Sequence, residues 1–263
     1  MDTLWTSLYD HAAIKFLNLQ RNHTILDVGC GSGLWGWTLR RLSRSKPAKL
    51  VGLDKDRTAL EQASKILGTN TDLVNADASF LPFRDDSFDL VTCRRLLINL
   101  RPRKRRQVIR EMKRVASGGG TLSSAEPSLH ISVANAFSTV SGSLYFSKRL
   151  ERAFSGTDFK LGPKVPYLFV REGLGNVDVW AYLIINRALP PRYSRNPFMN
   201  PIVHGGGFSH SLKTMAHPLR GDLGKRARLA AKRLDRETAK QVRRKSLVSV
   251  FVVPMFVTKG TKP

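Results

Sequence analysis

The sequence predicts an α/β fold of the doubly wound type, in which helices cover both faces of a mostly parallel β-sheet. Strand-like and helix-like segments alternate from residue 24 to about residue 125, which is the order of successive β-α-β units. A glycine cluster at residues 29–33 separates the first strand-like run from the first helix-like run, a usual ligand-binding position in such sheets. The 263 residues are 41% hydrophobic, enough for one large domain of this class.

The first half of the chain contains short apolar runs that we expect to be strands. They are Thr24–Val28, Leu50–Asp54, Asp72–Asn75, Phe88–Cys93 and Thr121–Ala125. Helical spacing of apolar residues occupies Leu34–Leu42 and the stripe from Leu60 to Leu67. A basic amphipathic helix is expected over Arg103–Ala116, ended by the glycines of Gly118–Gly120.

The alternation loosens in the second half of the chain. We expect residues 130–153 to be helical and to lie over the mouth of the sheet, and residues 190–221, rich in Pro, Gly, Asn and His, to form a long loop. The other expected elements are a helix at Pro166–Glu172, a strand at Asn176–Ile185, a strongly basic helix at Gly224–Lys245 and a final strand at Leu247–Thr258. No internal repeat and no break in composition indicates a second domain.

The chain is strongly basic, with 44 Lys and Arg against 20 Asp and Glu, which gives a formal net charge of +24. Much of the surplus falls on two predicted helices. The first cluster comprises Arg101, Arg103, Lys104, Arg105, Arg106, Arg110, Lys113 and Arg114, and the second comprises Lys225, Arg226, Arg228, Lys232, Arg233, Arg236, Lys240, Arg243, Arg244 and Lys245. Such helices suit RNA phosphates or an anionic membrane surface, but charge runs are also usual on solvated faces. Neither cluster carries the interleaved aromatic residues that stack on bases, so the partner stays open.

The small number of cysteines indicates a reducing compartment. Cys30 and Cys93 cannot build a disulfide framework and form no Cys-x-x-Cys pair. Three histidines of the expected long loop also lack zinc-binding spacing: His204, His210 and His217. We therefore expect no metal site and a reducing, cytoplasmic location. No basic leader precedes an apolar stretch, and the longest apolar run, Leu247–Val257, is too short to span a bilayer, so we expect neither secretion nor a transmembrane segment.

The segment from residue 25 to residue 36 reads ILDVGCGSGLWG. Glycines between a strand and a helix let the chain turn sharply, and they let a ligand approach the backbone without meeting a Cβ. Gly31, Gly33 and Gly36 also fit the dinucleotide fingerprint. However, Asp27 directly precedes the glycines, where its carboxylate would repel a pyrophosphate and attract a cationic ligand.

Two more carboxylates end neighbouring strands. Asp54, 21 residues after Gly33, ends the second strand, where it can accept hydrogen bonds from ribose hydroxyls, and Asp77 follows the third strand, where it can accept from an adenine amino group. Three carboxylates at three successive strand ends favour a nucleoside with positive charge and no phosphate. S-adenosylmethionine, with its sulfonium and ammonium groups, fits this description better than NAD. The chain also lacks the Tyr-x-x-x-Lys pair expected of an NAD-dependent oxidoreductase.

These pieces resemble the class I S-adenosylmethionine-dependent methyltransferases. In the family's order they are ILDVGCGSG (25–33), VGLDKD (51–56), NADASFLPFRDDSFDLVTCRRLLINL (75–100) and IREMKRVASGGGTL (109–122). Residues 167–179 are similar to the family's fifth helix and sixth strand, and residues 247–258 to its antiparallel seventh strand. The resemblance implies a Rossmann-like, seven-stranded sheet with strand order 3-2-1-4-5-7-6.

The resemblance also implies a single methyltransferase domain over residues 1–263. Its parts, in chain order, would be an N-terminal helix (1–22), a cofactor-binding half (24–125) and an acceptor-side half (126–263) that contains a lid (130–153) and the basic helix (224–245).

The resemblance assigns parts of the cofactor to particular residues. The implied contacts are Asp27, Gly29 and Gly31 to the methionine moiety, Asp54 to the ribose, Lys55 flanking the adenine, and Asp77 with Ala78 to the adenine edge. Cys30 and Arg94 complete the cofactor-binding residues. At the end of the fourth strand, Thr92, Cys93 and Arg94 would line the place where methyl donor and acceptor meet.

Methyl transfer from a sulfonium is an in-line displacement that needs alignment and exclusion of water, and it needs a base only when the acceptor must lose a proton. No motif marks such a base. The candidates, each of which also fits a structural role, are Tyr9, Asp10, His11, Glu126 and His130. Cys93 has the thiol that cytosine C5 methylation requires, but it lacks the preceding proline and the second cysteine of that chemistry. The fourth strand also lacks the Asn/Asp-Pro-Pro-Tyr/Phe tetrapeptide of base amino-methyltransferases.

Three functions follow from the sequence. A small-molecule methyltransferase is favoured by the match to generic small-molecule members through residues 125–185 and by the expected lid. An RNA-directed methyltransferase is suggested by the two basic helices. A binding protein of the same fold without turnover is the third, and the intact glycines and aspartates oppose it. Because the cofactor is itself cationic, the +24 charge does not attract it; the charge serves the acceptor, another partner or none.

Overall fold

The computed structural model describes residues 13, 15–19, 23–42, 49–69, 71–128, 133–135, 157–158, 160–188 and 249–263. Their helices and strands are β1 (Thr24–Val28), α2 (Leu34–Leu42), β2 (Lys49–Asp54), α3 (Arg57–Leu67), β3 (Asp72–Asn75), β4 (Phe88–Arg94), α4 (Pro102–Val115), β5 (Ala116–Pro127), β6 (Val133–Asn135), α6 (Val165–Arg171), β7 (Gly175–Ala188) and β8 (Ser249–Thr261). Two 3₁₀ turns, Leu97–Asn99 and Gly162–Lys164, complete the set.

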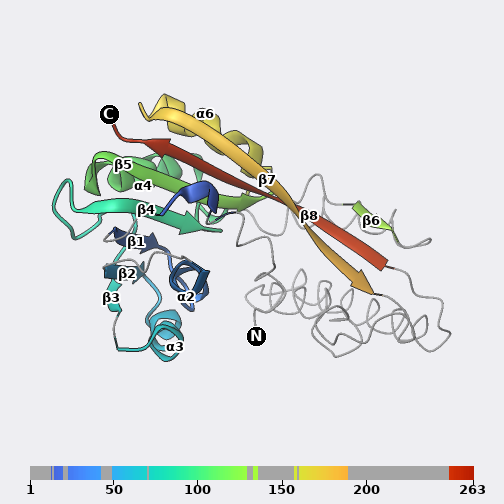
Figure 1. The fold of residues 1–263 in the computed structure, drawn as a ribbon, viewed down its shortest axis with the longest axis horizontal. Helices are drawn as coiled ribbons and strands as arrows, with labels where there is room; N and C mark the ends of the chain where they lie inside the picture. Colours follow the sequence, from blue (N-terminus) through green and yellow to red (C-terminus); the bar gives the residue numbers. More distant parts are fainter. Residues whose placement is uncertain are drawn as a thin grey trace.

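The strands form one sheet with the order β3-β2-β1-β4-β5-β8-β6, and β7 pairs with the other edge of β8 (Figure 1). Strands β1 to β5 are parallel, whereas β8 runs antiparallel to β5, β6 and β7. Because β7 and β8 are the sixth and seventh strands that the sequence predicts, the predicted order 3-2-1-4-5-7-6 is confirmed. The three-residue strand β6 is an addition to it.

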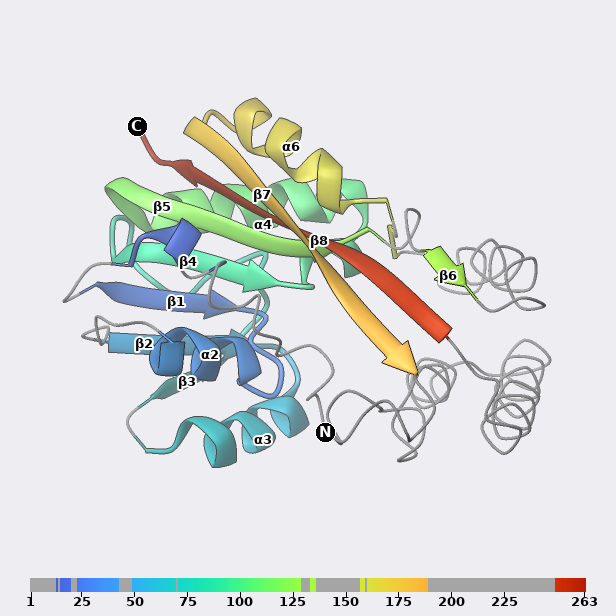
Figure 2. The same ribbon diagram turned by 45° about the vertical axis from the view of Figure 1, so that its right-hand side comes forward.

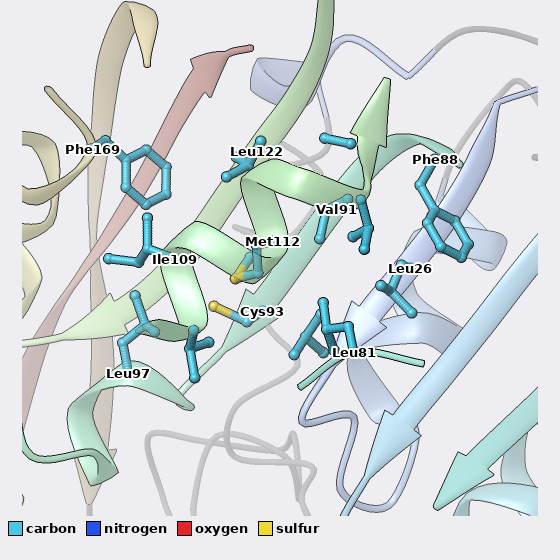
Figure 3. Packing of buried hydrophobic residues seen from close by; sticks show 14 of the residues in the cluster. Leu26, Leu81, Phe88, Val91, Cys93, Leu97, Ile109, Met112, Leu122 and Phe169 are labelled. Atoms are coloured by element: carbon cyan, nitrogen blue, oxygen red, sulfur yellow. The ribbon is translucent and has the colours of Figure 1, made fainter. Parts of the chain in front are cut away.

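Two cores lie on opposite faces of the sheet because side chains alternate along each strand. On one face, helices α4 and α6 cover a cluster that includes Leu26, Cys93 and Met112 (Figure 3). On the other face, α2, α3, Ala13 and Leu17 cover a second cluster, which includes Ile25 and Trp35. Figure 2 shows α2 and α3 together on this side of the sheet. Parallel strands buried on both faces have continuous apolar runs, which is why the strands of the first half could be recognised in the sequence.

The basic helix expected over Arg103–Ala116 is confirmed as α4 within one residue at each end, but the glycines do not end it. Helix α4 ends at Val115, and the chain continues directly into β5. Phe88 pairs with Ala116, but Leu90 pairs with Thr121, so residues 117–120 form a bulge in the ladder. Gly119 has a φ of +74° there, a conformation that glycine adopts without strain. The three glycines therefore accommodate a bulge and do not terminate the helix.

The helical prediction for residues 130–153 was wrong where the structure describes it. Val133–Asn135 is strand β6, paired with β8 through Val133 and Val252. Strand β8 continues beyond its pairing with β5, and β6 covers that part of its edge. Apolar spacing over so short a run does not separate a strand from a helix. The rest of that segment, the loop predicted at 190–221 and the basic helix predicted at 224–245 lie outside the described residues.

Candidate functional site

A left-handed glycine turn joins β1 to α2 at the carboxyl end of the sheet. Gly29, Gly31 and Gly33 have φ values of +68°, +53° and +83°, which disfavour any residue with a side chain. The backbone N–H groups of Gly29 and Cys30 both donate to the carbonyl of Leu53, at 2.7 and 2.9 Å, so the turn is fixed against β2. A Cβ built on Gly31 meets nothing within 4 Å. The turn is therefore rigid and borders open space at Gly31.

Asp27 is a buried carboxylate at the end of β1. It is 1% exposed, and neither of its oxygens has a hydrogen-bond partner among the described residues. Burial raises its pKa to about 7, although the nearby N–H of Gly36 and the charge of Arg94 favour the ionised form. A buried carboxylate without a partner is costly, and a bound cation would compensate it.

Asp54 lies beside the same turn at the end of β2. Its Oδ2 accepts a hydrogen bond from the N–H of Gly31 at 2.9 Å, and its Oδ1 accepts one from the N–H of Asp56 at 3.0 Å. These bonds fix the carboxylate while leaving each oxygen a second lone pair. Lys55 follows it and is exposed.

Asp77 follows β3, the next strand outward. Its Oδ1 accepts from the N–H of Ser79 and its Oδ2 from Nζ of Lys104, both at 2.8 Å. These bonds, with that to Lys104 the stronger, lower the pKa of Asp77 to about 2. Ala78 beside it is half-buried. Since β1, β2 and β3 are neighbours in the sheet, the three aspartates lie in the order that the sequence predicts.

Arg94, at the end of β4, lies beside Trp35 of α2 on the same face of the sheet as Asp27. Nε1 of Trp35, in α2, donates to Oγ1 of Thr92 at 3.2 Å, and the Arg94 guanidinium lies 5.1 Å from the centre of the Trp35 ring. Sequence reasoning included Arg94 and Thr92 but missed Trp35. A large aromatic residue in the first turn of the helix after the glycines is the signal that it left unused.

Cys93 points to the opposite face, into the core beneath α4 (Figure 3). It is fully buried, and burial holds the pKa of its thiol well above the ordinary value. Because the thiolate is the nucleophile of cysteine chemistry, this geometry does not suit the cytosine mechanism. Burial likewise raises the pKa of the Cys30 thiol.

The carboxylate of Glu126, one of the candidate bases, accepts hydrogen bonds from two backbone N–H groups. It is fully buried, and its oxygens accept from the N–H of Leu97 at 2.8 Å and of Ile98 at 3.3 Å. From the other side, the buried Arg105 donates to the carbonyls of Leu97 and Leu100, at 3.0 and 2.9 Å. The two side chains therefore clamp the turn that follows β4. Burial raises the pKa of Glu126 to about 7.

The other candidate bases, Tyr9, Asp10, His11 and His130, lie outside the described residues. Within the described ranges, no three His, Cys, Asp or Glu side chains gather closely enough to hold a metal ion. In the same ranges, no helix combines the length and the apolar character needed to cross a bilayer.

Residues 25–120 match a family model described as a methyltransferase domain. The chain is 29% identical over 191 residues to a demethylmenaquinone methyltransferase of Shouchella clausii, covering 64% of this chain and 77% of that protein. It is 37% identical over 116 residues to the methyltransferase GfsG of Streptomyces halstedii, but this match spans only 42% of this chain and 40% of that protein. The crystal structure of the YcgJ protein from Bacillus subtilis is similar in fold, with a TM-score of 0.58 at 17% identity over 97% of this chain and 99% of that one. The resemblance stated from the sequence is confirmed.

Proposed function

We propose that this chain is a class I methyltransferase that transfers a methyl group from S-adenosylmethionine to a small molecule. The observation that carries the proposal is the Asp27 carboxylate, which has no hydrogen-bond partner among the described residues and is buried directly behind a left-handed glycine turn. That position suits a ligand which is cationic near its end and which lies against bare backbone. S-adenosylmethionine has both properties.

The residues present fit this cofactor. The glycine turn and Asp27 would hold the methionine moiety, with Asp27 facing its ammonium group. Asp54 would accept from the ribose hydroxyls, and Lys55, Asp77 and Ala78 would surround the adenine. When bound, the cofactor supplies an activated methyl group on its sulfonium. The protein would then align the acceptor with that methyl group and exclude water.

Glu126 acts in this proposal as a positioning residue. Its carboxylate and the Arg105 guanidinium fix the turn at residues 95–100, next to Arg94. Within that turn, Arg95 has a φ of +57°, and its N–H donates to the carbonyl of Ala125 at 2.9 Å. Non-glycine residues in this conformation are strained, and strain gathers at functional sites. No described residue is assigned as the base.

The charges of α4 favour a small acceptor over RNA. Most basic side chains of this helix are engaged within the chain: Lys104 with Asp77, Arg105 with Asp158, Arg106 and Arg110 with Glu172, Lys113 with the carbonyls of Glu172 and Gly173, and Arg114 with Asp85 and Glu111. Cations already paired with carboxylates offer little to phosphates. The name of the Shouchella clausii relative points in the same direction, to a small acceptor such as a quinone.

An RNA acceptor is the second candidate, because the second basic cluster lies outside the described residues. A non-catalytic binding protein is the third. The single domain over residues 1–263 and the cytoplasmic location also stay predictions.

Incubation with methyl-labelled S-adenosylmethionine and a fractionated cell extract, with demethylmenaquinone added as one probe, tests the proposal. We expect label in the lipid or other small-molecule fraction, and at least a tenfold loss of labelling in Asp54→Ala. Asp72→Ala is the matched control, because Asp72 lies at the N-terminal end of β3, away from the glycine turn, and its side chain is 63% exposed. Label in RNA, with binding that weakens steeply above about 50 mM salt, would overturn the small-molecule acceptor. Binding of S-adenosylhomocysteine with no label in any fraction would favour the non-catalytic role.

A further inference from the structure

One stripe of α4 holds the loop that follows β3. Lys104, Gln107, Glu111 and Arg114 are spaced by three, four and three residues, so they lie on one face of the helix. Each of them bonds to the segment from Asp77 to Phe83. Gln107 Nε2 donates to the carbonyl of Ser79 at 3.1 Å, and Glu111 Oε2 accepts from the N–H of Leu81 at 2.8 Å.

Arg114 hydrogen-bonds the far end of the loop. It donates to the carbonyls of Leu81 and Phe83, both at 2.9 Å, and it is itself held by Glu111 at 2.9 Å. Three members of the stripe thus bond to the backbone. Lys104 is the exception, because the one bond of its side chain within the described ranges is to another side chain, the Asp77 carboxylate. The stripe therefore fixes the loop, and its first member bonds to Asp77, the carboxylate that the proposed function places beside the adenine.

We infer that Lys104 is a specificity-determining positioning residue that holds Asp77 for the amino group of a 6-aminopurine. The inference rests on the proposed function. Lys104 binds Oδ2 and the N–H of Ser79 binds Oδ1, so the plane of the carboxylate is fixed from both sides. The remaining lone pairs can accept from an exocyclic amino group.

The chemistry predicts discrimination between purines. Adenine presents a donor at its six position, whereas hypoxanthine presents a carbonyl, which an ionised carboxylate repels. A polar site built for a donor rejects an analogue that lacks it. Without Lys104, Asp77 keeps its charge but loses the bond that fixes Oδ2, so the carboxylate can turn away from the carbonyl of hypoxanthine. Discrimination should therefore fall while the fold remains, because Lys104 and Asp77 are 42% and 43% exposed.

The test is calorimetric binding of S-adenosylhomocysteine and S-inosylhomocysteine to the full chain. We expect Lys104→Met to lower the ratio of the two affinities about tenfold, the scale of one charge-assisted hydrogen bond, and Lys104→Arg to restore most of it. Arg103→Met is the matched control. Arg103 is the preceding residue of the same helix and is exposed. Because Arg103→Met removes the same charge, its ratio of the two ligand affinities should equal that of the wild type.

An unchanged ratio of the two affinities in Lys104→Met would overturn the inference. This includes an equal loss of both affinities, because a merely structural role would weaken both ligands alike. A wild type that binds S-adenosylhomocysteine while Lys104→Met keeps its ratio would leave the proposed function standing and remove this inference alone. A wild type that binds neither nucleoside would overturn both.

Discussion

Replacement of Asp27 by asparagine removes a buried charge while keeping the shape of the side chain. Burial raises the pKa of Asp27 from 3.8 to about 7. A difference of about three pKa units corresponds to roughly 4 kcal/mol, so the ionised carboxylate destabilises the ligand-free fold by that order above pH 7. Because a buried amide also loses hydration, we expect Asp27→Asn to raise the free energy of unfolding at about pH 8 by roughly 2–4 kcal/mol.

The pH dependence follows from the direction of the shift. Between the unfolded pKa of 3.8 and the folded pKa of about 7, the folded state holds a proton that the unfolded state has released. The free energy of unfolding therefore falls as pH rises through this window. Urea unfolding at several pH values should show a smaller fall in Asp27→Asn than in the wild type. Glu126, whose pKa is also raised to about 7, contributes equally to both proteins, so their difference isolates Asp27.

The same substitution should weaken S-adenosylhomocysteine binding by about ten- to a hundredfold, because the cofactor's ammonium loses its counter-charge. Wild-type affinity should rise with pH up to about 7 and then level off, whereas that of Asp27→Asn should stay flat. Asp56→Asn is the control, since Asp56 is exposed and caps α3, and asparagine caps a helix equally well. A destabilised Asp27→Asn at pH 8, or one with unchanged affinity, would refute the reasoning.

Two further substitutions test the clamp and the turn. Glu126→Leu should lower the free energy of unfolding by about 2–4 kcal/mol at pH 5, because the N–H groups of Leu97 and Ile98 lose their acceptor. The loss should be smaller at pH 8, because the ionised Glu126 destabilises the wild type there. An unchanged free energy of unfolding at pH 5 would contradict the role of Glu126 in fixing the turn. Gly31→Ala should cost about 1–2 kcal/mol of left-handed strain and weaken S-adenosylhomocysteine at least tenfold, since its methyl enters the open space beside the turn. Gly68→Ala, at positive φ with nothing within 4 Å but with a ψ of −176° at the end of α3, should lower the free energy of unfolding at least as much and leave the affinity unchanged.

The parallel strands and their terminal aspartates were predictable because each depends on local sequence. Thr24–Val28 is an apolar run that stops at a glycine cluster, and the carboxyl ends of parallel strands lie on the same side of the sheet. The positions of Asp27 and Asp54 therefore followed from strand ends alone. The order of β7 and β8 followed from the family resemblance and not from periodicity.

Long-range pairing is what the sequence could not supply. The positive charge of α4 suggested a nucleic-acid surface, but Glu172, which neutralises two of its arginines, lies more than 60 residues away. Lys104 was likewise included in the basic cluster, and only the fold brings it to Asp77. The Trp35 contact with Thr92 depends in the same way on α2 packing across β4.

Titration calorimetry of S-adenosylhomocysteine with the wild type at pH 8 tests the central claim most directly. We expect one-to-one binding that weakens at least tenfold in Asp54→Ala and in Asp27→Asn, while Asp72→Ala and Asp56→Asn keep the wild-type affinity. Absence of binding to the wild type at millimolar ligand, or equal affinity in all of these variants, would contradict the claim that the glycine turn and its aspartates form the cofactor site.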